Sequence, residues 1–260
     1  MINRNMAYRN QGLAVILLVF LLLGITYNLV NPLFEAPDEL WHYAFVRHLA
    51  MGGGLPVYQP GQDALYRQEG FQPPLYYALG ALATFWIDTS DLEGFIRPNP
   101  HAAIGFPGSD GNKNKVLHSD QERFPYRNTS LAVHIARLIS LFWGMATIVF
   151  TYLTAQELFP GERAIALGAA ALVAFNPQFL FIHSAVSNDA AVTALSSGVV
   201  FLGILLLTRG VSKPRLMALG VIVGLAAISK LNALPLFGWT AVALGVISWR
   251  EGSWRPILGR

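Results

Sequence analysis

Long uninterrupted apolar runs constrain this chain more than any other feature of its sequence. The first covers residues 12–30, close to the roughly twenty residues that a helix needs to cross a bilayer. Inside a bilayer the backbone must satisfy its own hydrogen bonds, which favours helices. Only 13% of the residues are charged and the mean hydropathy is +0.44, whereas soluble domains are about a quarter charged. The sequence therefore predicts an all-α integral membrane protein.

Several further apolar segments predict a polytopic transmembrane helix bundle of about six spans. They lie near residues 135–157, 164–182, 190–208, 216–229 and 233–248. The last two could also form one helix that is broken around Lys230 and Pro235. Arg4 and Arg9 precede the first run, and no small-residue cleavage motif follows it. We therefore expect an uncleaved, multi-pass anchor whose N-terminus lies in the cytoplasm.

The stretch between the first two predicted spans, residues 31–133, is polar and rich in glycine and proline. It holds 11 of the 15 acidic and 7 of the 18 basic residues, so its net charge is −4 and that of the remainder is +7. Basic residues favour cytoplasmic turns. With this stretch outside, Arg163, Arg209, Lys213 and Arg215 fall in such turns. We predict a long first extracytoplasmic loop, and the basic residues reflect topology and not a nucleic-acid partner.

Two short helices are expected inside this loop, both near the membrane surface. One extends from Pro37 to Met51, because proline suits a first helical turn and three glycines follow Met51. The other covers residues 73–87, which are apolar but too few for a span. Residues 97–127 contain several Pro, Gly and Asn residues and predict irregular loop.

Two adjacent carboxylates, Asp38 and Glu39, follow the first span closely. Ionisable groups near hydrocarbon are costly and often functional. Asp38 and His42 are four residues apart and would share one helix face. A carboxylate there could act as a general base on a hydroxyl, or bind a divalent cation with His42. Alternatively, the helix N-terminus favours acids, and Trp41 and Tyr43 anchor the interface.

Other polar positions fall at the outer ends of the later predicted spans. Asn188 and Asp189, which follow Ser187, could belong to a site or could cap the next helix. Lys230 and Arg137 could hold a phosphate, or could extend toward lipid headgroups. The chain has no cysteine, which excludes disulfides, thiolate metal sites and a cysteine nucleophile.

Four motifs occur in a characteristic order along the chain. They are Pro37-Asp38-Glu39, Gln72-Pro73-Pro74-Leu75-Tyr76-Tyr77, His134-Ile135-Ala136-Arg137-Leu138 and Gly224-Leu225-Ala226-Ala227-Ile228-Ser229-Lys230. In this order they resemble the C-type glycosyltransferase superfamily (GT-C), in particular its protein O-mannosyltransferase-like and aminoarabinose-transferase-like branch of bacterial membrane enzymes. The resemblance covers nearly the whole chain but only the N-terminal half of a usual member, as an N-terminal fragment would.

The resemblance implies one GT-C-like transmembrane domain over residues 1–260, with its candidate catalytic site in residues 31–133. It implies inverting transfer of a sugar from a polyprenyl-phosphate-linked donor to a glycan, lipid or protein hydroxyl, outside the bacterial plasma membrane. Asp38 maps onto the family's catalytic base with Glu39 beside it, and Asp189 maps onto a second acidic position. The substrate-binding residues expected on this basis are His42, Glu69, Gln72, Tyr76, Arg137, Asn188, Asp189 and Lys230.

Some features of the implied activity stay open at this level. Relatives often carry His or Lys before the Pro-Pro pair, where this chain has Gln72. No cofactor is implied with certainty, although a divalent cation is compatible with the acidic pair. The alternative function is non-catalytic: a membrane protein of the polyprenyl-lipid-binding or flippase type.

Overall fold

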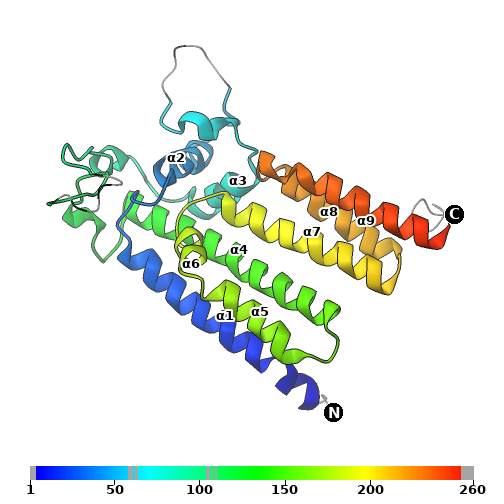
Figure 1. Cartoon of the computed structure of the whole chain (residues 1–260). Helices are drawn as coiled ribbons and strands as arrows, with labels where there is room; N and C mark the ends of the chain where they lie inside the picture. The colour runs from blue at the N-terminus through cyan, green and yellow to red at the C-terminus, as the bar shows by residue number, and fades with distance from the viewer. Residues whose placement is uncertain are drawn as a thin grey trace.

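The computed structural model describes residues 4–57, 61, 64–103, 106, 108 and 110–252, with side chains described from Gln11 onward. This part of the chain is helical and contains no β-strand (Figure 1). The α-helices are α1 (Arg4–Val30), α2 (Glu39–Ala50), α3 (Leu75–Thr84), α4 (Asn128–Leu158), α5 (Arg163–Ala174), α6 (Pro177–His183), α7 (Asp189–Arg209), α8 (Lys213–Ala227) and α9 (Pro235–Glu251). The predicted all-α fold is confirmed.

The helices that are long and apolar enough to cross a membrane number four in the described residues. They are Gln11–Val30, Asn128–Leu158, Asp189–Arg209 and Leu231–Glu251. The pair α5 and α6 would make a fifth span if the two count as one. The helix α8 occupies the remaining predicted position but has only 15 residues, fewer than the ~20 that a perpendicular span needs. The structure therefore contains four or five candidate spans in the described residues, and the expected number of about six is approximate.

The predicted span at residues 164–182 is bent and not continuous. Helices α5 and α6 meet at an angle of 61°. Pro177 starts α6, and the side chain of Asn176 accepts hydrogen bonds from the backbone N–H groups of Gln178 and Phe179. Asn followed by Pro is a helix-start signal. It divides this apolar segment because a proline cannot continue the preceding helix.

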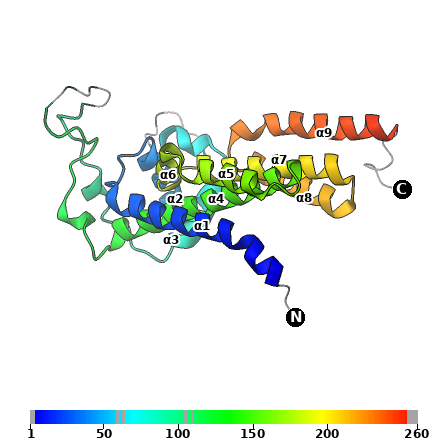
Figure 2. The ribbon, with the colours of Figure 1, turned by 60° about the horizontal axis from the view of Figure 1, so that its bottom comes forward.

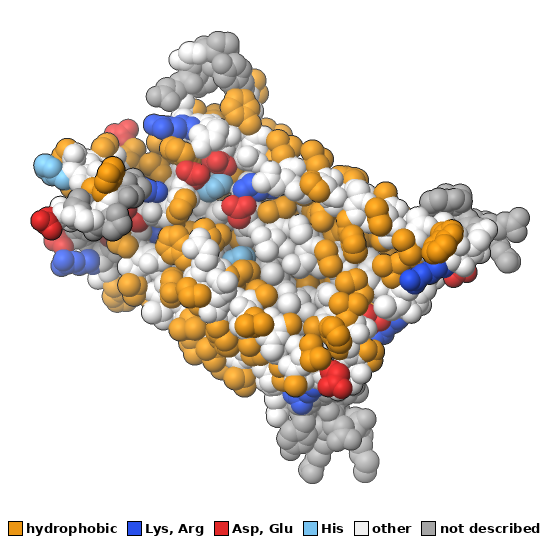
Figure 3. Space-filling model, in the orientation of Figure 1, with side chains coloured by type: hydrophobic (Ala, Val, Ile, Leu, Met, Phe, Trp, Pro, Cys, Tyr) orange, Lys and Arg blue, Asp and Glu red, His pale blue; other side chains and the backbone are white. Residues whose placement is uncertain are grey.

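The central helix of the bundle is α4, which contacts α1, α3, α5, α6 and α7. Helix α7 in turn packs on α8 and α9, and α9 lies along one edge (Figure 2). Glycines allow close approach at these crossings. A Cβ added at Gly144 would meet the rings of Phe20 and His183 within 3.1 Å, and one added at Gly203 would meet Trp239. Large apolar side chains cover much of the outer helix surfaces (Figure 3).

The segment that joins α1 to α4 lies at one end of the bundle and carries α2 and α3 (Figure 1). Helices therefore occur at both predicted positions in it. Buried aromatic residues of α2 and α3, including Tyr43, Phe45 and Tyr77, pack in one cluster with Ala132 and Val133 of α4. The backbone N–H of Leu75 also donates to the carbonyl of Ile228 after α8, 3.0 Å away. These contacts hold the segment firmly against the bundle.

The turns that join α4 to α5 and α7 to α8 lie at the opposite end of the bundle (Figure 1). Arg163 begins α5, Arg209 ends α7, and Lys213 and Arg215 lie in the first turn of α8. The basic residues are thus separated along the helices from the acidic segment. This is the charge distribution expected of a protein with that end in the cytoplasm.

Candidate functional site

A buried ion pair joins the second member of the acidic pair to α4. Both oxygens of Glu39 contact Arg137: Nε lies 2.7 Å from Oε1, and Nη2 lies 2.8 Å from Oε2. The Glu39 carboxylate also accepts the backbone N–H groups of Phe34 and Val186 at 3.0 and 2.9 Å. Both side chains of the pair are essentially inaccessible to solvent. One carboxylate therefore connects α2, α4 and the α6–α7 turn.

All five N–H groups of Arg137 are used inside the protein. Besides the two bonds to Glu39, Nη1 donates to the carbonyls of Asn28 and Asn31, and Nη2 donates to that of Pro32, at 2.8 to 3.1 Å. Arg137 is fully buried, so it does not extend toward lipid headgroups. It has no donor left for a phosphate, and its contacts hold the end of α1 against α2.

The first member of the acidic pair is placed very differently. Asp38 precedes α2, is exposed, and makes no hydrogen bond or ion pair through its side chain with any described residue. Its side chain does not cap α2, so capping does not account for this aspartate. Its backbone has φ 56° and ψ 5°, a left-handed conformation that is uncommon outside glycine and is often found at functional sites. The carboxylate is free to contact a ligand.

Beside Asp38, three buried polar side chains form a closed cluster. Nδ1 of His42 lies 2.9 Å from the hydroxyl of Tyr77 and 3.2 Å from Oε2 of Glu69. The Tyr77 hydroxyl donates to the same Glu69 oxygen at 3.0 Å. We call this the His42–Tyr77–Glu69 cluster; it joins α2, α3 and the 3₁₀ helix Arg67–Phe71.

Burial and neighbouring charge set the protonation of this cluster. Burial, and then the positive charge of Lys230, lower the pKa of His42 to about 4. Burial raises the pKa of Glu69, and its hydrogen bond from Tyr77 opposes this. Burial and the neighbouring Glu69 carboxylate raise the pKa of Tyr77 far above its usual range. At neutral pH we therefore expect His42 to be neutral and Tyr77 to keep its proton.

The lowered pKa of His42 predicts a pH-dependent stability. An unfolded histidine titrates near 6.5, so between about pH 6.5 and pH 4 the unfolded chain binds a proton that the folded protein does not, and stability falls as the pH falls. The effect is on the order of 3 kcal/mol across this window. We expect His42→Gln to flatten the fall in the unfolding temperature between pH 7 and 4.5, measured in detergent. His101→Gln, at an exposed histidine, should leave it intact; equal slopes in both variants would contradict this assignment.

Lys230 and Asp189 form an ion pair on the other side of the cluster. Nζ of Lys230 lies 2.6 Å from Oδ1 of Asp189, and Asp189 is half exposed. The backbone bond from Leu75 to Ile228 and the bond from the Ser187 N–H to Tyr76 bring this pair to α3, which also carries Tyr77 of the cluster. The charges of Lys230, Asp189 and Asp38 influence the pKa of His42 in addition to burial. Figure 3 shows acidic, basic and histidine side chains side by side near the start of α7.

The remaining predicted residues lie behind this site. The hydroxyl of Tyr76 contacts Ser140 at 2.7 Å and accepts the backbone N–H of Ser187 at 3.0 Å, so it positions the α6–α7 turn. Asn188 precedes α7 and is fully buried, but its side chain makes no capping bond, and neither amide atom has a partner in the described structure. Oε1 of Gln72 is likewise buried without a described partner.

Asp189 also lines an open groove of about 630 Å³. The groove is lined mainly by residues of α4, α5 and α7, together with Asn232. Its lining combines apolar residues such as Leu158, Ile165 and Val200 with serine and threonine. The hydroxyls of Thr151 and Ser197 bond to the carbonyls of their own helices, so the groove presents a mainly apolar surface.

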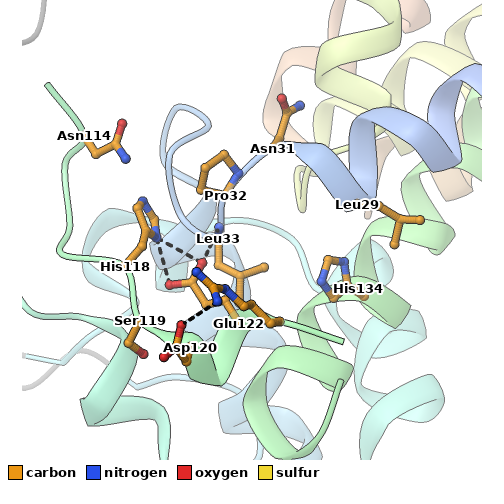
Figure 4. A pocket seen from close by; sticks show the side chains of 11 residues that line it. Leu29, Asn31, Pro32, Leu33, Asn114, His118, Ser119, Asp120, Glu122 and His134 are labelled. Atoms are coloured by element: carbon orange, nitrogen blue, oxygen red, sulfur yellow. Dashed lines mark hydrogen bonds and ion pairs between the residues drawn. The ribbon is translucent and has the colours of Figure 1, made fainter. Parts of the chain in front are cut away.

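A separate cavity of about 420 Å³ opens between the end of α1 and residues 114–123 (Figure 4). His118 lies between two carboxylates there: Nε2 is 3.0 Å from Glu35, and Nδ1 is 2.8 Å from Glu122. Glu122 also accepts the backbone N–H of Leu33, and Glu35 accepts those of Lys115 and Val116. These contacts attach the irregular part of the segment to the residues that precede Asp38. Across the described residues, no three His, Asp or Glu side chains are arranged to hold a metal ion.

The predicted residues thus separate into two groups. The candidate site contains Asp38, His42, Glu69, Asp189 and Lys230. The second group is buried or half-buried behind it and contains Glu39, Gln72, Tyr76, Arg137 and Asn188. Sequence reasoning missed Tyr77, although it stands inside a motif quoted above. The available signal was its position next to Tyr76, but adjacency in a helix does not reveal which of two tyrosines faces the histidine.

The fold and the site together define a helical membrane protein with ionisable groups gathered at one end of its bundle. Residues 131–255, just under half of the chain, match the family model of dolichyl-phosphate-mannose-protein mannosyltransferase. The match supports a membrane glycosyltransferase of the GT-C type, as the order of motifs predicts. It includes Arg137, Asn188, Asp189 and Lys230 and excludes Asp38. No curated protein and no solved structure matches the chain.

Proposed function

We propose that this protein transfers a sugar from a polyprenyl-phosphate-linked donor to an acceptor hydroxyl, with inversion, on the outer face of a bacterial plasma membrane. Asp38 acts as the general base. The observation that carries the proposal is the exposed, unpaired Asp38 carboxylate beside a site that also holds the cation of Lys230. A base and a cation are the two groups that this reaction requires.

The reaction divides the work between these two groups. Asp38 accepts the proton of the acceptor hydroxyl while the oxygen of that hydroxyl bonds to the anomeric carbon. The bond between that carbon and the phosphate oxygen breaks, and its electron pair leaves with the lipid phosphate. Lys230 stabilises the charge that develops on the phosphate. Glu39 and Arg137 act as positioning residues, because their contacts with each other and with the backbone leave none for the substrate.

The groove beside Asp189 supports a lipid-linked donor. Asp189, the ion-pair partner of Lys230, lines the groove, which also reaches Leu158 and Ile165 at the opposite end of the bundle. An isoprenoid chain would bury apolar surface there while its phosphate lay near Lys230. The acceptor class stays open among glycan, lipid and protein hydroxyls.

The same groove also favours the second candidate, a polyprenyl-lipid-binding or flippase-type protein without chemistry. Such a protein needs the groove and Lys230 but has no use for a free base. The two candidates therefore differ in what they require of Asp38.

The direct test is transfer of labelled mannose from polyprenyl-phosphate mannose to acceptors in membranes that contain the protein. Mannose is the first probe because of the family match, and other lipid-linked hexoses and pentoses follow. We expect label in the acceptor fraction, above that of membranes without the protein. A parallel reaction with a chelator shows whether a divalent cation is required. Lipid binding without transfer of any tested sugar would favour the non-catalytic candidate.

Lys230→Gln is expected to lower the transfer rate by about 10²–10³-fold, the usual effect of removing one group that stabilises a developing negative charge. The fold should survive, because Asp189, its partner, is half exposed. Lys213→Gln, at an exposed lysine of the opposite end, is the matched control and should keep the wild-type rate. Initial rates under saturating donor provide the measurement. A Lys230→Gln rate within threefold of wild type would remove Lys230 from the mechanism.

A further inference from the structure

The His42–Tyr77–Glu69 cluster has a defined arrangement of protons. Tyr77 has one hydroxyl proton and donates it to Oε2 of Glu69. If Nδ1 of His42 carried no proton, its lone pair would face the phenol oxygen and the carboxylate, 2.9 and 3.2 Å away. The lone pair of Nδ1 would then face two oxygen atoms with no proton available to lie between them. Nδ1 therefore carries the proton, and neutral His42 has its lone pair on Nε2.

The cluster leaves two acceptor atoms free. Nε2 of His42 and Oε1 of Glu69 have no hydrogen-bond partner among the described residues, and neither atom is fully enclosed. The rest of each side chain is buried. Their positions are held by Tyr77, which is itself fully buried and stacks on Phe45 at a centroid distance of 4.2 Å.

The surroundings of these two atoms suit a polyhydroxylated ligand. Both atoms only accept hydrogen bonds in this arrangement, so their natural partners are hydroxyl donors. His42 lies one helical turn after Asp38, and its backbone N–H donates to the Asp38 carbonyl at 3.0 Å. Helix α3, which carries Tyr77, is bonded through Leu75 to Ile228, two residues before Lys230, the proposed phosphate-binding residue. A sugar bound between the phosphate and the base would present its hydroxyl groups here.

We propose that Nε2 of His42 and Oε1 of Glu69 accept hydrogen bonds from hydroxyl groups of the donor sugar, and that Tyr77 is the positioning residue that holds both. This inference rests on the proposed function, because it assumes a lipid-linked sugar as the ligand. It assigns recognition of the sugar to the cluster and recognition of the phosphate to Lys230.

Glu69→Gln is the most informative variant. The amide oxygen can still accept from Tyr77 and His42, so the amide nitrogen takes the place of Oε1 and the free acceptor becomes a donor. We expect the affinity for polyprenyl-phosphate mannose to fall by about 10-fold or more, as for loss of a hydrogen bond to a charged group. The affinity for sugar-free polyprenyl phosphate should stay within twofold of wild type. Glu93→Gln, at an exposed glutamate, is the matched control.

Tyr77→Phe tests the positioning role. We expect a smaller loss of affinity, about threefold to tenfold, again only for the sugar-bearing lipid. The ¹⁵N chemical shifts of His42, assigned by comparison with His42→Gln, should show the Nδ1–H tautomer in the wild type and a mixture in Tyr77→Phe. A wild-type His42 protonated on Nε2 would overturn the proposal.

The binding data separate failure of this inference from failure of the proposed function. Equal binding of sugar-bearing and sugar-free lipid by the wild-type full chain would contradict the proposed donor. A wild-type preference for the sugar-bearing lipid that persists in Glu69→Gln would overturn only the role of the cluster. An equal loss of affinity for both lipids in Glu69→Gln would show that Glu69 has a merely structural role, and it would also overturn the role of the cluster in sugar recognition.

Discussion

Asp38→Asn is expected to reduce the rate of sugar transfer by about 10²–10⁴-fold, the usual contribution of a general base. Asparagine has nearly the same size but cannot accept a proton from the acceptor hydroxyl. The Asp38 side chain makes no described contact that folding depends on, and asparagine tolerates the left-handed backbone conformation at this position. The fold and the binding of polyprenyl phosphate should therefore be unchanged.

The experiment compares Asp38→Asn with Asp110→Asn, an exposed aspartate of the same segment. Transfer from labelled polyprenyl-phosphate mannose and binding of sugar-free polyprenyl phosphate are measured on each variant. The catalytic assignment predicts lost transfer with retained binding in Asp38→Asn and wild-type values in the control. A transfer rate within threefold of wild type in Asp38→Asn would exclude this residue as the base.

Arg137→Met should lower the free energy of unfolding by about 3–5 kcal/mol, because removal of one partner leaves a buried charge without compensation. Glu39 would keep only its two backbone donors, and the carbonyls of Asn28, Asn31 and Pro32 would lose theirs. Arg137→Lys should also destabilise, since an ammonium group cannot replace five N–H donors in a planar arrangement.

The control for Arg137 is Arg123→Met, which breaks the ion pair with Asp120 in the segment between α1 and α4. Both of these side chains are more than 80% exposed, and exposed pairs contribute little. We expect no measurable change in its chemical denaturation curve in mixed micelles, against a clear shift for Arg137→Met. Equal shifts in the two variants would show that the buried pair is not a principal stabilising contact.

Much of the fold could be predicted from local patterns. Apolar runs indicate helices of membrane-spanning length, and Pro37 and the three glycines after Met51 bound α2 closely. The bend between α5 and α6 was missed because the hydropathy of that segment is continuous, although Asn176 and Pro177 contained the signal. Hydropathy reports the preference for lipid, whereas a helix break depends on the backbone chemistry of one residue.

The site was predictable in composition but not in arrangement. The resemblance selected Asp38, Asp189 and Lys230, and the structure brings them to the same end of the bundle from segments far apart in the chain. Tyr77 was not selected, because its role depends on contacts with His42 on another helix. Such contacts leave no periodic trace in a sequence.

The sequence by itself determined that this protein is a helical membrane bundle, with an acidic segment at one end and an Asp-Glu pair near the first span. Those properties follow from hydrophobicity and charge, which each residue carries with it. Only the tertiary structure decided that the two neighbouring carboxylates have opposite roles. Glu39 is buried because Arg137, 98 positions further along, reaches it, whereas Asp38 faces outward because the left-handed turn precedes α2. Long-range pairing and backbone direction separate two residues that composition and spacing cannot distinguish.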